Sequence, residues 1–435
     1  MSPFFAIAWV LISLGCLMGA VRYLASQSGM SAELSRKCVH IVMGLITLTF
    51  PWLFHEFWPV FVLGLVSVIL LSAVRTVGFL KKSIGTVLGG VERASLGDVY
   101  FPVSVTLLFW LSQGDPIFYC IPILILTLAD AMSALIGVQY GQNKYSTSEG
   151  TKSIEGSVAF FTVAFLGTHL PLLLASSVGR LESVLIAMMM GLLLMMLEAV
   201  ALAGLDNILV PVGAFLFLKL YLVMPVSDLL HRLLLLLPLF VLMFVLRQRS
   251  ELKGSSLLLS TLCLYAFWAL GGVSWLMPPL LVFLLYPFVL SKRPESPELF
   301  GLTAVTTTVA TGFFWLLLSK VFFVPQGLLA SAVAFAAHFA IIMASNRLAL
   351  NPDRSVFKEG ALAIFLAWLM LMLPFLVITN LLTYPVLLFS FLVIATTMTA
   401  FLLTQKELSD HVLNKKRWAY RGLIVFLGSL LVLWI

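Results

Sequence analysis

Charged side chains are scarce in this sequence. Only 10% of its 435 residues are Asp, Glu, Lys or Arg, and 61% are hydrophobic. A soluble domain carries roughly 25% charged residues. This balance excludes a soluble globular protein, a disordered chain and a nucleic-acid-binding protein. The formal net charge of +7 therefore indicates basic loops on one side of a membrane.

Cysteine is also rare, with four residues, no two of which are close in sequence. Their spacing excludes a disulfide framework and a CxxC metal site, so we interpret them as small buried hydrophobic residues. The N-terminal segment has no basic stretch before its apolar run and no clear cleavage site. We expect it to be a retained first helix with its N-terminus outside.

Long apolar runs are abundant and continuous, as in residues 61–74 and 232–246. A β-barrel would alternate apolar and polar residues, whereas a helix satisfies its own backbone hydrogen bonds in lipid. Since a span needs about 20 residues, we expect an all-α, polytopic membrane helix bundle with about sixteen transmembrane helices. The segment 99–112 is short enough to be re-entrant instead. The expected helices are 3–24, 38–54, 58–74, 99–112, 117–139, 156–176, 183–204, 208–224, 231–246, 256–271, 275–290, 300–319, 327–345, 360–378, 384–404 and 420–435.

The basic residues support the order of these helices. Of the 26 Lys and Arg residues, all but Arg180, Lys219, Arg232 and Lys320 fall in alternate loops or at the adjoining helix ends. The positive-inside rule then makes the loop 25–37, and every second loop after it, cytoplasmic. Residues 1–225 carry the polar motifs, and residues 226–435 form a second hydrophobic, multi-helix part to which the sequence assigns no role.

One carboxylate lies inside an expected span. Thr127, Asp130, Ala134, Gly137 and Gly141 follow helical spacing and form one small, polar stripe. An ionisable group at this depth costs at least a few kcal/mol, which favours a functional role for Asp130. Close helix packing through small residues is the alternative explanation of the stripe.

The loop that follows, residues 141–157, is polar and rich in Gly and Ser. Exposed backbone N–H groups, a lysine and a helix N-terminus together suit a polyphosphate. A carboxylate there could hold a divalent cation. An ordinary solvated loop with a helix cap is the alternative. The candidate residues are Lys144, Lys152, Ser153, Glu155, Gly156 and Ser157.

Three further polar clusters lie near the same expected face. Residues 33–44 carry Arg36, Lys37 and His40, which a basic membrane anchor would also explain. Residues 91–102 contain Arg93, in a segment that is equally consistent with an interfacial loop. The third cluster contains Glu198, inside the membrane, followed by Asp206 and Asn207. Helix capping explains Asp206 or Asn207 but not Glu198.

Five motifs in these clusters occur in a recognisable order. They are RKxxH at Arg36, Lys37 and His40, ERxSxGxxYFP at 92–102, DxxxAxxxxxxG at Asp130, Ala134 and Gly141, KSxEGS at 152–157, and ExxxxxxxDNxxxP at 198–211. Together they resemble the CTP-dependent polyprenol kinase family, which includes phytol kinase, dolichol kinase and CTP-dependent diacylglycerol kinases. The resemblance covers roughly residues 30–225. It implies an integral membrane enzyme that transfers the γ-phosphate of CTP to a lipid alcohol at the cytoplasmic face.

The resemblance also implies roles for the candidate residues. Catalytic roles fall to Asp130, Lys152, Glu155, Asp206 and Glu198, with Asp130 and Glu155 as the Mg²⁺ ligands and Asp206 or Glu198 acting on the acceptor hydroxyl. The residues expected to contact CTP are Arg36, Lys37, His40, Arg93, Gly137, Gly141, Lys144, Ser153, Gly156, Ser157 and Asn207.

Two other functions stay open at this point. The stretch from Asp130 to Glu155 also looks like part of CTP:phosphatidate cytidylyltransferase, although the later basic and Asp-rich signature of that family is missing. A lipid or solute transporter would explain the many helices and the intramembrane carboxylates. The sequence decides neither the lipid alcohol nor the oligomeric state.

Overall fold

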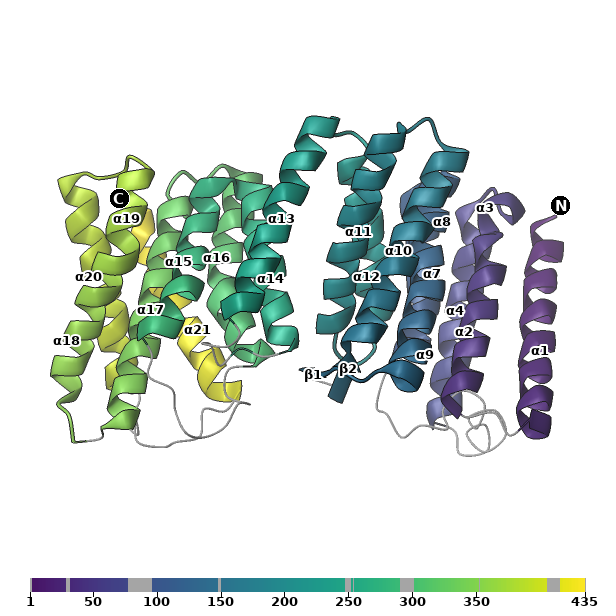
Figure 1. Cartoon of the computed structure of the whole chain (residues 1–435), viewed down its shortest axis with the longest axis horizontal. Helices are drawn as coiled ribbons and strands as arrows, with labels where there is room; N and C mark the ends of the chain where they lie inside the picture. Colours follow the sequence, from purple (N-terminus) through teal and green to yellow (C-terminus); the bar gives the residue numbers. More distant parts are fainter. Residues whose placement is uncertain are drawn as a thin grey trace. The chain divides into compact units, whose positions relative to one another are not determined.

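The computed structural model describes residues 2–28, 32–76, 96–147, 150–246, 252, 254–289, 301–351, 353–404 and 415–434. Its elements are almost all helices (Figure 1), which confirms the all-α membrane bundle. Among the described residues, eleven helical segments are long and apolar enough to cross a membrane, and three shorter helices are also apolar. The expected number of sixteen is therefore not confirmed.

Contacts divide the chain into two units, Met1–Leu233 and Leu234–Ile435. The division lies inside helix α13 (Val226–Leu246), and the sequence boundary at 225/226 stays a prediction. The other elements of the first unit are α1 (Pro3–Ser28), α2 (Ala32–Leu48), α3 (Phe50–Leu53), α4 (Phe57–Thr76), α7 (Gly97–Ser112), α8 (Pro116–Leu124), η1 (Ile125–Ala129), α9 (Asp130–Tyr140), β1 (Lys144–Thr147), β2 (Gly150–Ser153), α10 (Ile154–Ala175), α11 (Arg180–Val200) and α12 (Asp206–Tyr221).

The core of the first unit brings together helices that are far apart in the sequence. Its fully buried side chains include Leu108 on α7 and Tyr119 and Ile123 on α8. The Tyr119 hydroxyl donates to the Thr47 carbonyl 3.0 Å away on α2, so the one polar atom of this large side chain is satisfied. This core fixes α2 against α8. It therefore also sets the position of the residues nearer the N-terminal end of α2.

The segment from α8 to α9 is a continuous helix interrupted by a π-helical turn. Asp115 caps its start by accepting from the Ile117 N–H at 2.8 Å. Pro122 has no N–H to give to the helical ladder, and the five-residue π-turn η1 follows shortly after it. The apolar pattern of residues 117–139 predicts one uninterrupted helix here, because the residues before and after the turn are equally apolar.

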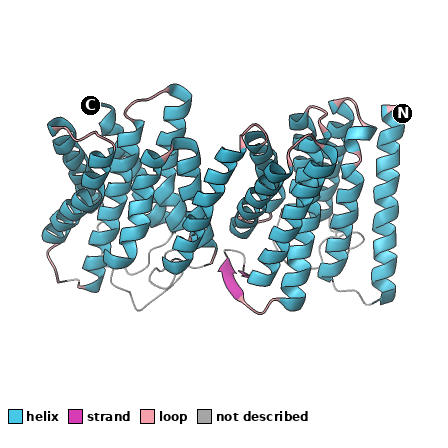
Figure 2. Cartoon of the chain, turned by 45° about the horizontal axis from the view of Figure 1, so that its top comes forward, coloured by secondary structure: helices cyan, strands magenta, loops and turns pink. Residues whose placement is uncertain are grey.

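A short antiparallel hairpin lies at one end of the first unit (Figure 2). Lys144 pairs with Ser153 and Thr147 with Gly150, whose φ of +134° suits only glycine. The loop expected at residues 141–157 is thus partly a β-hairpin. The Ser153 hydroxyl then accepts from the Gly156 N–H at 3.1 Å and caps α10. The hairpin therefore delivers its last residues directly to a helix N-terminus.

The second unit is built around one helix, α17 (Gly327–Leu350), which is almost entirely buried. Next to it, Trp315 of α16 donates to the Ser429 hydroxyl of α21 at 2.9 Å. The other elements are α14 (Ser255–Gly271), α15 (Val273–Val289), α16 (Leu302–Phe322), α18 (Val356–Ala367), η3 (Trp368–Met372), α19 (Leu373–Ile378), α20 (Tyr384–Thr404), α21 (Lys415–Leu430) and η4 (Leu431–Trp434).

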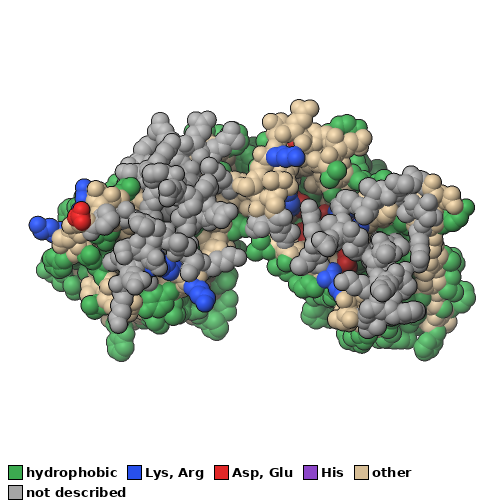
Figure 3. All heavy atoms as spheres, turned by 90° about the horizontal axis from the view of Figure 1, so that it is seen from below, with side chains coloured by type: hydrophobic (Ala, Val, Ile, Leu, Met, Phe, Trp, Pro, Cys, Tyr) green, Lys and Arg blue, Asp and Glu red, His purple; other side chains and the backbone are tan. Residues whose placement is uncertain are grey.

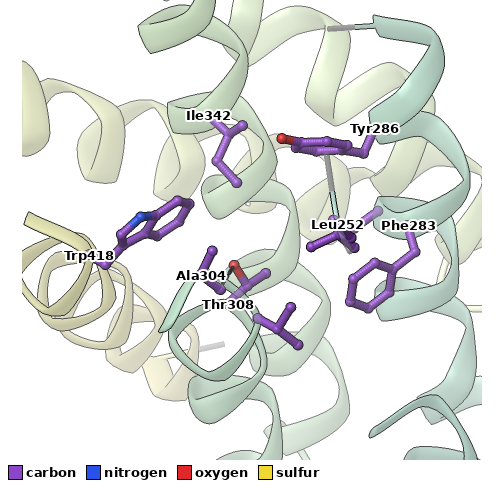
Figure 4. A pocket seen from close by; sticks show the side chains of 9 residues that line it. Leu252, Phe283, Tyr286, Ala304, Thr308, Ile342 and Trp418 are labelled. Atoms are coloured by element: carbon purple, nitrogen blue, oxygen red, sulfur yellow. Dashed lines mark hydrogen bonds between the residues drawn. The ribbon is translucent and has the colours of Figure 1, made fainter. Parts of the chain in front are cut away.

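A small apolar cavity of about 30 Å³ lies in the second unit (Figure 4). It is lined by aromatic and aliphatic side chains such as Trp418, Tyr286 and Ile342. The Thr308 hydroxyl at its wall is already bonded to the Ala304 carbonyl. Since this space is about the size of one water molecule and its lining is apolar, we interpret it as a gap in helix packing.

Candidate functional site

An ion pair joins Asp130 of the polar stripe to the basic cluster at residues 33–44. Asp130 is the first residue of α9, and its Oδ2 lies 2.7 Å from the Nζ of Lys37 on α2. The Lys37 side chain is only 3% exposed and also lies 3.4 Å from the Asp130 carbonyl oxygen. His40 lies one turn further along α2, with its Nε2 3.6 Å from the same carboxylate oxygen. A buried lysine thus neutralises the intramembrane carboxylate.

A second lysine–carboxylate pair links the hairpin to α11. The Nζ of Lys152, on β2, donates to Glu198 Oε1 at 2.6 Å and to the Glu198 carbonyl at 2.7 Å. Glu198 is buried, and its other oxygen, Oε2, has no hydrogen-bond partner among the described residues. Burial alone would lower the pKa of Lys152, but the adjacent Glu198 carboxylate outweighs it and raises that pKa. Lys152 is therefore a firmly charged ammonium group.

Asp206 is the third carboxylate of the region. It starts α12, just after a turn in which Ala203 and Gly204 both have positive φ. Burial, together with the negative charge of nearby Asp130, raises the pKa of Asp206 to about 6, and Glu198 acts in the same direction. The positive charge of Lys152 opposes this rise only in part.

Asp206 thus links the two ion pairs, because the charges of Asp130, Glu198, Lys37 and Lys152 all act on it. Figure 3 views the face that carries the hairpin and shows basic and acidic side chains near one another in the first unit. Asn207 links the start of α12 to its neighbours. Its side-chain amide donates to the Gly204 carbonyl at 3.2 Å, and its backbone carbonyl accepts from the Ser104 hydroxyl of α7. Arg36 is half-buried on α2, and its charge also acts on Asp130.

Glu155 lies apart from these carboxylates. Its Oε1 accepts from the backbone N–H and the side-chain amide of Asn143, at 3.1 and 2.8 Å. Within the described part of the chain it makes no ion pair or hydrogen bond with Asp130. The structure therefore places Glu155 at the hairpin, whereas Asp206 is the carboxylate on which the charge of Asp130 acts. Sequence spacing could not show this, because Asp130 and Asp206 are brought together only by the tertiary fold.

The three predicted glycines lie where α9 and α10 cross. A Cβ on Gly156 would lie 2.8 Å from the Ser133 carbonyl oxygen and 3.2 Å from the Gly137 Cα. A Cβ on Gly141 would collide with the Gly137 carbonyl and the Ser153 side chain. Close packing of α9 against α10 and Ser153 explains why glycine stands at these positions, and for Gly137 and Gly141 this is the alternative that the sequence had left open.

The remaining candidates are spread around the hairpin. The Ser157 hydroxyl is 2.7 Å from the hydroxyl of Tyr145, a hairpin residue that the sequence analysis did not single out. Ser153 is used as the α10 cap, and Lys144 is exposed at the start of β1. Arg93 lies outside the described residues.

The donor atoms of the region suit a hard cation. Carboxylate oxygens are what Mg²⁺ prefers, and in phosphoryl-transfer sites it usually takes one or two of them and completes its shell with phosphates and water. Asp130 and Asp206 fit this need, and Glu198 offers its unpartnered Oε2. Among the described residues, no three acidic, His or Cys side chains converge closely enough to hold a metal by themselves.

Comparison with known proteins identifies the family of this site. The chain is 30% identical over 206 residues to phytol kinase from Synechocystis sp. (strain ATCC 27184 / PCC 6803 / Kazusa), a match that covers 85% of that protein and 47% of this chain. The chain belongs to the phytol kinase family. No family model matches the sequence. No solved structure matches it either.

Membership of the phytol kinase family confirms the resemblance that the five motifs predicted. It identifies a lipid-alcohol kinase relationship for the part of the chain that the match covers, within an integral, multi-pass membrane protein. More than half of the chain lies outside the match.

Proposed function

We propose that the first unit transfers the γ-phosphate of CTP to the hydroxyl group of a lipid alcohol at the cytoplasmic face. The observation that carries this proposal is the gathering of Asp130, Glu198 and Asp206 with Lys37 and Lys152 in a chain of the phytol kinase family. Phosphoryl transfer needs mainly positioning and charge neutralisation on the phosphates, and this cluster offers both cations and cation ligands.

In this proposal the two lysines exchange partners when the nucleotide binds. Lys37 and Lys152 each hold one carboxylate in the ligand-free structure. The phosphates would take over the lysines, and the released carboxylate of Asp130 would then hold Mg²⁺ together with Asp206, which has no ion pair among the described residues. Bound Mg²⁺ would neutralise charge that develops on the phosphates. Asp130 and Lys37 thus form a resting pair that opens to bind the nucleotide.

Glu198 or Asp206 would act on the acceptor. As the bond between the γ-phosphorus and the CDP oxygen breaks, a new bond forms from the alcohol oxygen, whose proton passes to one of these carboxylates. The unpartnered Glu198 Oε2 is suited to accept a hydrogen bond from that hydroxyl. Phytol, shorter prenols, dolichol and diacylglycerol are the candidate alcohols.

The test is label transfer by membranes that contain the full-length protein. We expect label from γ-labelled CTP in the extracted lipid, with CDP as the second product, when phytol and the other alcohols are offered in turn. Mass spectrometry of the product identifies the alcohol. A cytidylyltransferase would instead attach label from α-labelled CTP to phosphatidate and release pyrophosphate. Absence of transfer to every alcohol with every nucleotide triphosphate would refute the proposal.

A matched pair of variants locates the activity. Asp130→Asn keeps the side-chain shape but loses the charge that a hard-cation site needs, so activity should fall by about 100-fold or more. Raising the Mg²⁺ concentration should restore part of it, because extra metal compensates for a weakened ligand but not for a lost base. Asp115→Asn, at the far end of the same helical segment, should leave transfer unchanged. Full activity of Asp130→Asn at low Mg²⁺ would exclude this residue from the site.

A further inference from the structure

The π-helical turn η1 decides which way Asp130 points. It spans Ile125–Ala129, and the residues on either side of it, Leu124 and Asp130, have ordinary α-helical backbone angles. A π-turn inserts one extra residue, so every side chain after it is rotated by about 100° relative to an uninterrupted α-helix. Asp130 is the first residue to feel this rotation. Whatever holds the turn in place therefore also sets the direction of the carboxylate.

Helix α2 contacts this turn at two points. The Nε2 of His40 lies 3.1 Å from the Leu126 carbonyl oxygen inside the turn. A carbonyl only accepts, so Nε2 must carry the hydrogen and donate it. One helical turn further along α2, Gly44 packs directly on Thr127, and a Cβ at that position would collide with the threonine side chain.

The same face of α2 also holds the carboxylate. Lys37, His40 and Gly44 follow i, i+3 and i+7 spacing and so lie on one side of the helix. The His40 Nε2 is 3.6 Å from Asp130 Oδ2, while the Lys37 Nζ is 2.7 Å from it. The imidazole is fixed from behind by an edge-to-face contact with Phe101 of α7, at 5.2 Å between ring centres.

We propose that His40 is a positioning residue whose Nε2–H holds the Leu126 carbonyl and thereby sets the π-turn that presents Asp130 to Lys37. In this role His40 acts through Asp130. The sequence had instead suggested that His40 contacts CTP. The geometric part of the proposal is independent of the reaction, and its kinetic consequence rests on the proposed function.

The geometric part is tested by zero-length cross-linking of the full-length protein in membranes. A carbodiimide joins a lysine and a carboxylate that are in contact, and mass spectrometry compares the Lys37–Asp130 product with the Lys152–Glu198 product in the same sample. His40→Phe keeps a ring but has no N–H, so it should reduce the Lys37–Asp130 product several-fold and leave the other unchanged. His40→Gln can still donate to Leu126 and should retain both products.

The outcomes of cross-linking are decisive without an activity assay. Equal Lys37–Asp130 yields in wild type and His40→Phe would overturn the proposal. A loss of the Lys37–Asp130 product in His40→Gln as large as that in His40→Phe would also overturn the proposal. It would show that a side-chain N–H at position 40 does not hold this pair together.

The kinetic consequence is a loss of kcat at nearly constant KM for the lipid alcohol. We expect His40→Phe to lower kcat by about 100-fold, since a displacement of about 1 Å at a reacting group has effects of this size. His40→Gln should recover most of that loss. The matched controls are His169→Phe and His169→Gln, because His169 is a helix-borne histidine of the same unit that bonds Ser183 instead. An inactive wild type with the cross-linking pattern above would refute the proposed function and leave the positioning role standing.

Discussion

At the scale of single residues, the carboxylates of the site differ in whether they form an ion pair. Lys37 neutralises Asp130 and Lys152 neutralises Glu198, but among the described residues Asp206 has no ion pair. A carboxylate in such a place is costly unless it is protonated or meets a cation. Asp206 is therefore the carboxylate of the site whose charge costs most.

The cost of ionised Asp206 predicts a stability that depends on pH. Its pKa of about 6 in the folded protein exceeds the value of about 3.9 for an unfolded Asp. A group with a raised pKa contributes stability below about pH 4 and loses that contribution as the pH rises through 6. Asp206→Asn keeps the acceptor oxygen for Asn207 and removes the charge. We therefore expect it to stabilise the ligand-free protein by about 1 kcal/mol at pH 7.5, and much less at pH 5, since solvent screens this half-buried group.

Thermal unfolding of the detergent-solubilised protein at the two pH values measures this difference. Asp228→Asn, at an exposed position in the first turn of α13, is the control and should show no such pH dependence. If Asp206→Asn were no more stable than the wild type at pH 7.5, the ionised Asp206 carboxylate would not destabilise the folded protein.

At the scale of secondary-structure elements, α9 and α10 pack closely where they cross near the site. A methyl group at Gly156 would press on the Ser133 backbone, which cannot move aside as a side chain can. A Cβ on Gly167 of the same helix would lie no closer than 3.5 Å to the flexible Leu124 and Ile125 side chains. The two glycines thus differ in what surrounds them, although both lie on α10.

This difference predicts opposite results for two identical substitutions. Gly156→Ala should separate α9 from α10 and destabilise the protein by about 1–3 kcal/mol, the usual cost of overpacking. Gly167→Ala should be neutral or slightly stabilising, because alanine favours the helix by up to about 1 kcal/mol. The measurement is the unfolding midpoint of each variant at pH 6. A Gly156→Ala variant as stable as the wild type would contradict the packing role of this glycine.

Some features of these elements could be predicted from the sequence, and others could not. Periodicity and charge placed Asp130, Lys152, Glu198 and Asp206 in the candidate site, because polar residues in long apolar runs are conspicuous. The π-turn could not be foreseen, since the helical spacing from Thr127 to Gly141 assumes an uninterrupted α-helix. The position of Glu155 beside Asn143 depends on the hairpin register, which a Gly- and Ser-rich sequence specifies weakly.

At the scale of the whole molecule, composition predicted the membrane bundle but not the number of helices. Two expected spans, α7 and α14, form helices of 16 and 17 residues and are not among the eleven candidate spans, because this length is at the lower limit for crossing a membrane. The orientation remains a prediction from the basic loops. Helix α10 offers a direct way to test it, since exposed Ser146 lies in the hairpin before it and exposed Ser177 in the loop after it.

We expect Ser146→Cys and Ser177→Cys to differ in accessibility from outside the cell. In a background without the four native cysteines, an impermeant thiol reagent added to intact cells should label Ser177→Cys and spare Ser146→Cys. Permeabilised cells should show labelling of both. Labelling of Ser146→Cys alone in intact cells would invert the topology and place the proposed nucleotide site on the outer face.

The two lysine–carboxylate pairs also bear on how the chain is assembled during synthesis. Asp130 follows Lys37 by 93 residues, and Glu198 follows Lys152 by 46. Each lysine therefore leaves the ribosome well before its acid and must stay at the bilayer surface, since an unpaired charge is costly in lipid. Each acid is stable at its position only when it is paired with its lysine. The Lys152–Glu198 pair can therefore form only after α11 has been synthesised.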